Sequence, residues 1–143
     1  ASDVYKRQRY GNETVGYVTK PENWLDFTDP NASPTAVQIC IDPQNIVTLD
    51  FLPKENGLTA EKMARIIMQK YLNEGVPKEN MSLDTVILNG YEAINLTILM
   101  NDESLYSASY IDHNGKIYML VQEGNADTRM ELANVISSWN PDK

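Results

Sequence analysis

The most restrictive feature of this sequence is a short segment near its C-terminal end that would be apolar on both sides of a strand. Residues 118–121 read Tyr-Met-Leu-Val, so both faces of a strand there carry apolar side chains. Such a strand is stable where both faces of its sheet are covered. We therefore expect 116–122 to be a central strand with a packing layer on each side.

Two amphipathic helices are available to form those layers. The first follows Thr59, which we expect to be its N-cap, and stops before Gly75. Its predicted inward face carries four apolar side chains and the stem of a lysine: Met63, Ile66, Ile67, Lys70 and Tyr71. The second helix is predicted to begin at Asp127 as N-cap, and its apolar face is Leu132, Val135, Ile136 and Trp139.

Alternating apolar and polar residues predict strands in much of the remaining chain. The segments are 15–19, 37–41, 47–51, 83–88, 94–100, 104–111 and 116–122. The first three are expected to form an antiparallel meander. Asn89-Gly90 is a strong hairpin signal, because both residues tolerate positive φ. The predicted fold class is therefore α+β, with an antiparallel β-sheet flanked by helices.

The first eight residues stand apart from this pattern. Residues 1–8, Ala-Ser-Asp-Val-Tyr-Lys-Arg-Gln, resemble the translation of a sequencing adapter of the kind used for shotgun libraries. We exclude them from the fold as a non-native tail. A single domain is expected over 9–143, a length typical of one domain. The adapter indicates a metagenomic read set, and we expect the native chain to continue upstream of Arg9.

The charge distribution argues against nucleic acid as a partner. The chain has 20 acidic and 12 basic residues, a formal net charge of -8, and no Lys or Arg between Glu79 and Gly115. A nucleic-acid-binding surface needs clustered basic side chains, which this composition does not provide. No stretch reaches the ~18 apolar residues of a membrane-spanning helix.

The sequence lacks the residue patterns of common catalytic and metal sites. His113 is the single histidine and is expected in an exposed turn, while Cys40 is the single cysteine and is expected to be buried in a strand. No Gly-rich phosphate loop and no nucleophile motif occur. We therefore expect no catalytic residues, no cofactor-binding residues and no metal ligands.

Several acids and one tryptophan remain open to more than one interpretation. Three carboxylates, Asp26, Asp29 and Asp42, could converge in space as a site, although chance is the simpler account of any closeness between them. Asp50 lies in an otherwise apolar strand and is expected to point outward. Trp24 is expected to be a core residue at one end of the sheet, and the alternative is an exposed anchor for a partner.

The order of these elements resembles the PsbP-like (Mog/PsbP-like) family. The similar features are the Gly16-Tyr17-Val18 strand before Pro21-Glu22-Asn23-Trp24, the mid-chain helix, the Asn89-Gly90 hairpin, Gly115-Lys116-Ile117-Tyr118, and the closing Ser138-Trp139. The resemblance covers about 14–141 and implies an α/β/α sandwich that binds or assembles rather than catalyses. Its similarity to the bacterial lipoproteins of the family implies an extracytoplasmic domain with a possible upstream lipid anchor.

These expectations lead to a first hypothesis and an alternative. The first is a non-catalytic accessory or protein-interaction domain of a bacterial extracytoplasmic protein, with an unknown partner. The alternative is a small-ligand carrier with a cleft between sheet and helix, and an enzyme ranks third. A deep pocket with converging polar groups would favour the carrier. A broad apolar surface patch would favour the interaction domain.

Overall fold

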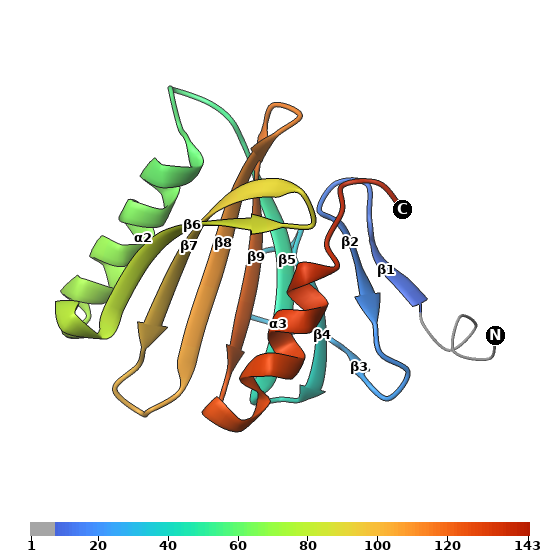
Figure 1. Cartoon of the computed structure of the whole chain (residues 1–143), viewed down its shortest axis with the longest axis horizontal. Helices are drawn as coiled ribbons and strands as arrows, with labels where there is room; N and C mark the ends of the chain where they lie inside the picture. The colour runs from blue at the N-terminus through green and yellow to red at the C-terminus, as the bar shows by residue number, and fades with distance from the viewer. Residues whose placement is uncertain (1–7) are drawn as a thin grey trace.

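A seven-stranded antiparallel sheet organises the chain (Figure 1). The computed structural model describes residues 8–143, and residues 1–7 of the predicted non-native tail lie outside the described residues. The strand order is β3-β4-β5-β9-β8-β7-β6. The strands are β3 (Leu25–Phe27), β4 (Val37–Asp42), β5 (Asn45–Pro53), β6 (Met81–Leu88), β7 (Tyr91–Leu99), β8 (Leu105–His113) and β9 (Lys116–Gly124). β9 lies between β5 and β8, so the predicted central position of 116–122 is confirmed.

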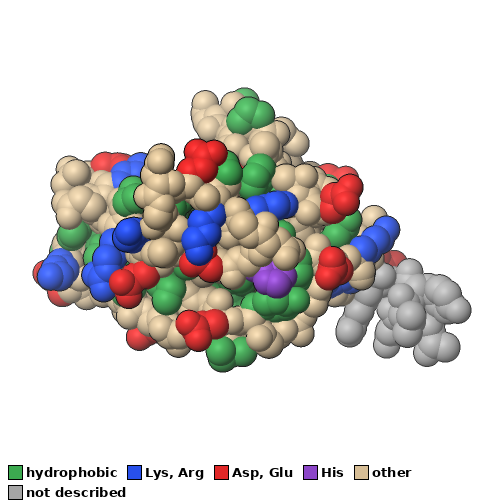
Figure 2. Space-filling model, turned by 90° about the horizontal axis from the view of Figure 1, so that it is seen from above, with side chains coloured by type: hydrophobic (Ala, Val, Ile, Leu, Met, Phe, Trp, Pro, Cys, Tyr) green, Lys and Arg blue, Asp and Glu red, His purple; other side chains and the backbone are tan. Residues whose placement is uncertain are grey.

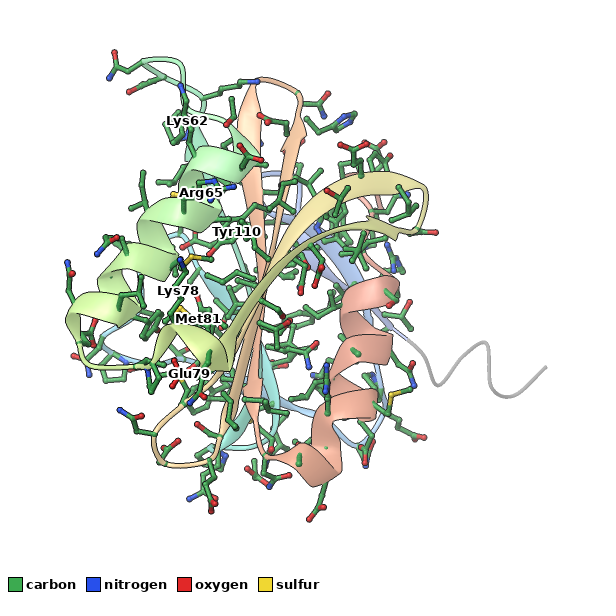
Figure 3. The ribbon with its side chains drawn as sticks, turned by 60° about the vertical axis from the view of Figure 1, so that its left-hand side comes forward. Lys62, Arg65, Lys78, Glu79, Met81 and Tyr110 are labelled. Atoms are coloured by element: carbon green, nitrogen blue, oxygen red, sulfur yellow. The ribbon has the colours of Figure 1, made fainter. Side chains whose placement is uncertain are left out.

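One helix covers each face of this sheet. α2 (Ala60–Asn73) packs over β7 and β8, and α3 (Arg129–Ser137) packs over β5 and β9 on the opposite face. Figure 3 shows the two helices on either side of the strands. The predicted α+β class, an antiparallel sheet flanked by helices, is confirmed. No helix among residues 8–143 combines the length and apolar character needed to cross a membrane.

Helix α2 begins and ends as predicted but turns a different face inward. The Thr59 hydroxyl accepts a hydrogen bond from the Lys62 backbone N–H at 3.1 Å, and Gly75 has φ +97° after the helix end. Ala60 and Ala64 are buried, whereas the predicted inward residue Ile66 is 55% exposed. The small alanines let the helix approach the sheet closely, so its packing stripe is centred on them rather than on Ile66.

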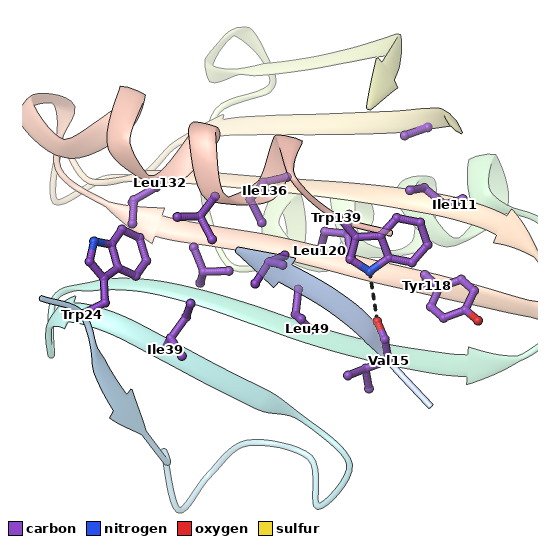
Figure 4. Close-up of a cluster of buried hydrophobic side chains, with 14 residues drawn as sticks. Val15, Trp24, Ile39, Leu49, Ile111, Tyr118, Leu120, Leu132, Ile136 and Trp139 are labelled. Atoms are coloured by element: carbon purple, nitrogen blue, oxygen red, sulfur yellow. Dashed lines mark hydrogen bonds between the residues drawn. The ribbon is translucent and has the colours of Figure 1, made fainter. Parts of the chain in front are cut away.

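Helix α3 keeps its predicted apolar face but starts differently. The Asn125 side chain accepts from the Thr128 backbone N–H at 3.1 Å and caps a 3₁₀ turn, η2 (Ala126–Thr128), which leads into α3. The prediction of Asp127 as the N-cap is therefore wrong, because Asp127 already lies inside that turn. The four predicted face residues, Leu132, Val135, Ile136 and Trp139, are all at most 5% exposed (Figure 4).

A second, two-stranded sheet corrects the predicted meander. β2 (Gly16–Lys20) pairs with β1 (Gln8–Asn12) and does not join β4 and β5. It packs on the α3 side, where the Trp139 indole N–H donates to the Val15 carbonyl at 3.1 Å (Figure 4). A Cβ on Gly16 would lie 2.3 Å from the Trp139 indole nitrogen. This close contact holds β2 against the core, away from the sheet edge.

The predicted hairpin at Asn89-Gly90 is confirmed. The two residues have φ +48° and +87° and connect β6 to β7. The Asn89 side-chain N–H₂ also donates to the Trp139 carbonyl at 3.0 Å. The hairpin tip is thereby tied to the end of α3.

Candidate functional site

Helix α3 leaves part of its sheet face uncovered. It has nine residues and is therefore roughly 14 Å long. Its main contacts are with β9, β5 and β2, so within residues 8–143 no helix packs closely on the same face of β6, β7 and β8. On this face β7, β8 and β9 present neutral polar side chains, and β6 presents two apolar ones: Asn95, Thr97, Ser107, Ser109 and Gln122, with Val86 and Leu88.

A groove of about 200 Å³ lies between α3 and these strands. Its apolar walls are Val86, Leu88, Leu120 and Ile136, and α3 also contributes Arg129, Ala133 and Ser137. Figure 3 shows side chains of the strands and of α3 facing each other, with the β6–β7 hairpin curling over one end. Apolar walls around a small set of polar groups are typical of small-molecule sites.

The floor of the groove is held by a side-chain network centred on Asn95. Its amide nitrogen donates to the hydroxyls of Ser107 and Ser109, each at 3.0 Å, and its carbonyl oxygen accepts from Thr97 at 2.8 Å. Ser109 is 4% exposed and uses its oxygen as an acceptor in this network. Its hydroxyl proton has no acceptor among residues 8–143, so it is free to meet a ligand.

Gln122 has further unused hydrogen-bonding capacity. Its amide nitrogen makes one long bond, 3.4 Å, to the Arg129 carbonyl. Its carbonyl oxygen accepts from no group in the described part of the chain. A primary amide offers two donors and one acceptor oxygen with two lone pairs. Gln122 can therefore present a donor and an acceptor side by side to a molecule in the groove.

A second hollow of about 420 Å³ lies on the other flank of α3. It is lined by Thr19, Pro21, Asn23, Trp24, Glu131, Asn134, Val135 and Ser138. Trp24 is 4% exposed, so its prediction as a core residue is confirmed and the alternative of an exposed anchor is wrong. The hydroxyl of Ser138 here is already used, since it accepts from Thr19 and donates to Val135.

The single histidine is not in an exposed turn. β8 extends through His113, and the turn consists of Asn114 and Gly115. The imidazole packs edge-on against the Tyr91 ring with centroids 5.2 Å apart, and Figure 2 shows it at the surface beside hydrophobic side chains. His113 is half-buried and is the last residue of β8, so the predicted placement in the turn is wrong and the predicted exposure is only partly right. The ring has no hydrogen bond to any of residues 8–143.

Asp50 lies under the 28–36 loop, and Cys40 lies in the neighbouring strand β4. Cys40 is buried as predicted, and burial, with the Asp42 charge adding to it, raises the pKa of its thiol. Asp50 was expected to point outward, and this is wrong, since it is 8% exposed. The Thr35 hydroxyl donates to its carboxylate at 2.6 Å, which binds the loop over this strand.

The other acids have separate partners. Asp26 pairs with Lys20, Asp42 accepts from the Asn45 amide at 2.9 Å, and Asp29 accepts from the Asn31 backbone N–H. In the described residues no three His, Cys, Asp or Glu side chains gather around a point that could hold a metal ion. The predicted possibility of converging Asp26, Asp29 and Asp42 is therefore not realised.

One perturbed acid was missed by the sequence interpretation. Partial desolvation raises the pKa of Glu123, and the Asp29 charge adds to the effect. Glu123 lines a third hollow, of about 380 Å³, together with Asp102. The pKa of Asp102 is lowered by hydrogen bonds from Ser104, and its carboxylate is exposed. Nothing in the strand pattern around Glu123 indicates this shift, because it depends on neighbours distant in sequence.

Comparison with known proteins defines the fold. No family model matches the sequence, and no curated protein matches it. Cyanobacterial PsbP (CyanoP) from Synechocystis sp. PCC 6803 has a similar structure, with a TM-score of 0.66 and 16% identity over 94% of this chain and 92% of that one. The fold is therefore PsbP-like, and the resemblance predicted from the sequence is confirmed at the level of the fold.

Two further solved structures are similar. A crystal structure from Bacteroides thetaiotaomicron has a TM-score of 0.52 and 10% identity over 94% of this chain and 47% of that one. LpqN of Mycobacterium tuberculosis, involved in cell envelope biogenesis, has a TM-score of 0.46 and 15% identity over 92% and 87%. At these identities the likeness concerns the fold alone.

Proposed function

We propose that the chain is a non-catalytic binding domain that holds a small polar molecule in the groove between α3 and β6–β9. The observation that carries this proposal is the pair of unused polar groups on the groove floor, the Gln122 carbonyl oxygen and the Ser109 hydroxyl proton. Both lie between apolar walls. No buried side-chain nitrogen or oxygen among residues 8–143 lacks a hydrogen-bond partner, so the Gln122 oxygen is open to solvent and a ligand would replace water there.

This proposal favours the small-ligand carrier over the protein-interaction domain. Among residues 8–143, the large apolar side chains that are exposed come from five different elements: Leu25, Ile66, Ile87, Leu99 and Met130. Scattered apolar residues of this kind need no partner, whereas an interaction surface concentrates them in one patch. The free edge of β6, which pairs with β7 alone, keeps the accessory or protein-interaction domain as a second candidate.

The non-catalytic character is supported by the chemistry of the described residues. His113 has no acid or nucleophile as a partner, and general acid–base catalysis needs such groups within hydrogen-bond reach. Glu123 is the one carboxyl whose pKa is raised, whereas hydrolysis by carboxylates requires two acids with distinct roles across a cleft. Its neighbour in the hollow, Asp102, is exposed and engaged with Ser104.

We further propose that this is a domain of a bacterial extracytoplasmic protein, tethered by a lipid anchor encoded upstream. This part rests on the sequence resemblance to the lipoproteins of the PsbP-like family. The gene upstream of the Arg9 codon provides the test. A signal peptide with a lipid-attachment cysteine would support the proposal, and a cytoplasmic domain fused in frame would contradict it.

The binding proposal can be tested by blocking the groove. Ser137 is exposed and lines the groove, so Ser137→Trp places an indole over it with little risk to the core. Gln69→Trp, on the outward face of α2, is the matched control. Saturation-transfer NMR would be recorded with a mixture of amino acids, N-acetyl amino acids and monosaccharides. We expect binding that Ser137→Trp abolishes and Gln69→Trp leaves intact; no binding, or equal loss in both variants, would overturn the proposal.

A further inference from the structure

We propose that the groove recognises a small acid that also carries an amide, such as the C-terminal end of a short peptide. Arg129 would bind the carboxylate, and Gln122 would bind the amide. This inference rests on the proposed binding function and names the chemical class of its ligand. It follows from the charge, the hydrogen-bonding groups and the size of the groove.

The charge of the groove is opposite to that of the molecule. The chain as a whole has 20 acidic and 12 basic residues. No Asp or Glu lines the groove, and Arg129 is its one charged residue. An anionic group is therefore repelled by much of the surface and attracted to this site. The positive charge of Arg129 favours a ligand with a carboxylate over a ligand with an ammonium group.

The Arg129 guanidinium is available for such a group. It forms no ion pair and no side-chain hydrogen bond with any of residues 8–143. By contrast, Arg65 lies 3.8 Å from Glu61, and Lys54 pairs with Asp112 at 2.9 Å. A guanidinium binds a carboxylate through two parallel hydrogen bonds, which a lysine ammonium cannot reproduce. Arg129 is exposed, so it lies at the mouth, where a ligand's charged end can remain partly hydrated.

The floor beyond Arg129 suits a neutral amide. Gln122 offers an acceptor oxygen and a spare N–H, and this pair is complementary to the N–H and C=O of a peptide group. The Ser109 hydroxyl adds a donor at the floor. The Gln122 side chain donates to the Arg129 backbone carbonyl at 3.4 Å, so it lies at the first turn of α3, and the Arg129 side chain lines the same groove. A carboxylate and an amide separated by one residue would reach both.

The size of the groove limits the ligand to a short segment. Its volume, about 200 Å³, is below the roughly 300–1,000 Å³ of a site for a drug-sized molecule. The apolar walls, including Val86 and Leu88, can receive a methyl or small aliphatic side chain. One or two amino-acid units meet these conditions, with the free carboxylate as the charged end.

The test compares two probes that differ only in the terminal group, which is a charged carboxylate in one and a neutral carboxamide in the other. N-acetyl-alanyl-alanine and its C-terminal carboxamide would be titrated into the ¹⁵N-labelled full chain, its Arg129→Gln variant and the matched control Arg65→Gln. An ion pair with an exposed side chain is screened by solvent, so we expect the acid to bind roughly two- to fivefold tighter than the carboxamide. Arg129→Gln should remove this preference, and Arg65→Gln should retain it.

The possible outcomes distinguish a failure of this inference from a failure of the proposed binding function on which it rests. Equal affinity for acid and carboxamide at the groove would overturn the carboxylate assignment and leave the binding function standing. A preference for the acid that survives in Arg129→Gln would overturn the role of Arg129. If neither probe shifts the resonances of groove residues, this inference is overturned. The binding function is then tested separately, by the saturation-transfer spectra of the ligand mixture with the parent protein and with Ser137→Trp.

Discussion

The two faces of the sheet are built in different ways. On one face, α2 has 14 residues, a side-chain cap at Thr59, and two buried alanines that let it lie close to β7 and β8. On the other face, α3 has nine residues, follows a 3₁₀ turn, and packs over β5 and β9. The α2 face is covered by apolar contacts, whereas the α3 face keeps an open groove with a polar floor.

The two faces of the sheet therefore have different roles: the α2 face packs the core, and the α3 face carries the proposed binding groove. Neighbouring residues of β7 alternate between the faces, so Leu96 is fully buried under α2 while Asn95 organises the groove floor. The same strand thus supplies core side chains on one side and hydrogen-bonding side chains on the other. Substitutions on the two faces should therefore differ in their effect on stability.

The largest effect is expected at the junction that holds α3 in place. Trp139 is fully buried, packs at a tilt of 59° against the Tyr118 ring with centroids 4.9 Å apart, and donates to the Val15 carbonyl. Trp139→Ala should cost about 3–5 kcal/mol of unfolding free energy, because it leaves a cavity and an unpaired carbonyl. Urea denaturation measures this. A loss under about 1 kcal/mol would show that α3 does not depend on this junction.

The next effect compares the two faces within one strand. Leu96→Ala on the α2 face should cost about 2–5 kcal/mol, since it opens a cavity in the core. Asn95→Ala on the groove floor should cost about 1 kcal/mol, because water can reach the hydroxyls that it releases. Thermal and urea unfolding of both variants provide the comparison. Equal losses would mean that the groove floor is packed as tightly as the α2 face.

Two glycines with nearly equal φ isolate the contact between β2 and α3. Gly16 and Gly90 have φ +86° and +87°, but a Cβ would strike Trp139 at Gly16 and meet nothing within 4 Å at Gly90. Gly90→Ala should cost about 1–2 kcal/mol from backbone strain alone. Gly16→Ala should cost about 2–4 kcal/mol, because steric overlap is added. Similar losses in urea denaturation would show that the indole moves aside freely.

The smallest effect concerns Glu123, whose pKa is raised in the folded protein. A raised carboxyl pKa means that ionisation opposes folding, so this group contributes more stability as pH falls from neutral through its folded-state pKa. Glu123→Gln should therefore stabilise slightly at pH 7, by about 0.5 kcal/mol or less after solvent screening. The difference from the parent protein should shrink toward pH 4. A Glu123→Gln variant that is less stable than the parent protein at pH 7 would contradict this prediction, because it would show that ionised Glu123 stabilises the fold.

Much of the fold could be predicted from local patterns. Alternation located the strands, Asn89-Gly90 located a hairpin, and the apolar run at 118–121 identified the central strand. The inward face of α2 was partly wrong, because alanines carry little apolar signal although they allow the closest packing. The pairing of β2 with β1 was missed, since residues 8–12 have no clear apolar alternation.

The candidate site could not be predicted from the same patterns. Asn95, Thr97, Ser107 and Ser109 look like ordinary outward positions of half-buried strands, and nothing in their spacing indicates a binding site. They form a groove floor because α3 is short and lies over β9, which is a long-range property. The burial of Asp50 was missed for a similar reason, because the loop that covers it is held by Thr35.

Mapping of ligand-induced shifts tests the central claim most directly. The ¹⁵N-labelled full chain would be titrated with N-acetyl-alanyl-alanine, and backbone amide shifts would be assigned to residues. The structure predicts the largest changes at Ser107, Ser109, Gln122 and Arg129, with α2 and its strand contacts unaffected. Shifts confined to α2 or to the free edge of β6 would contradict the assignment of the α3 face as the binding face.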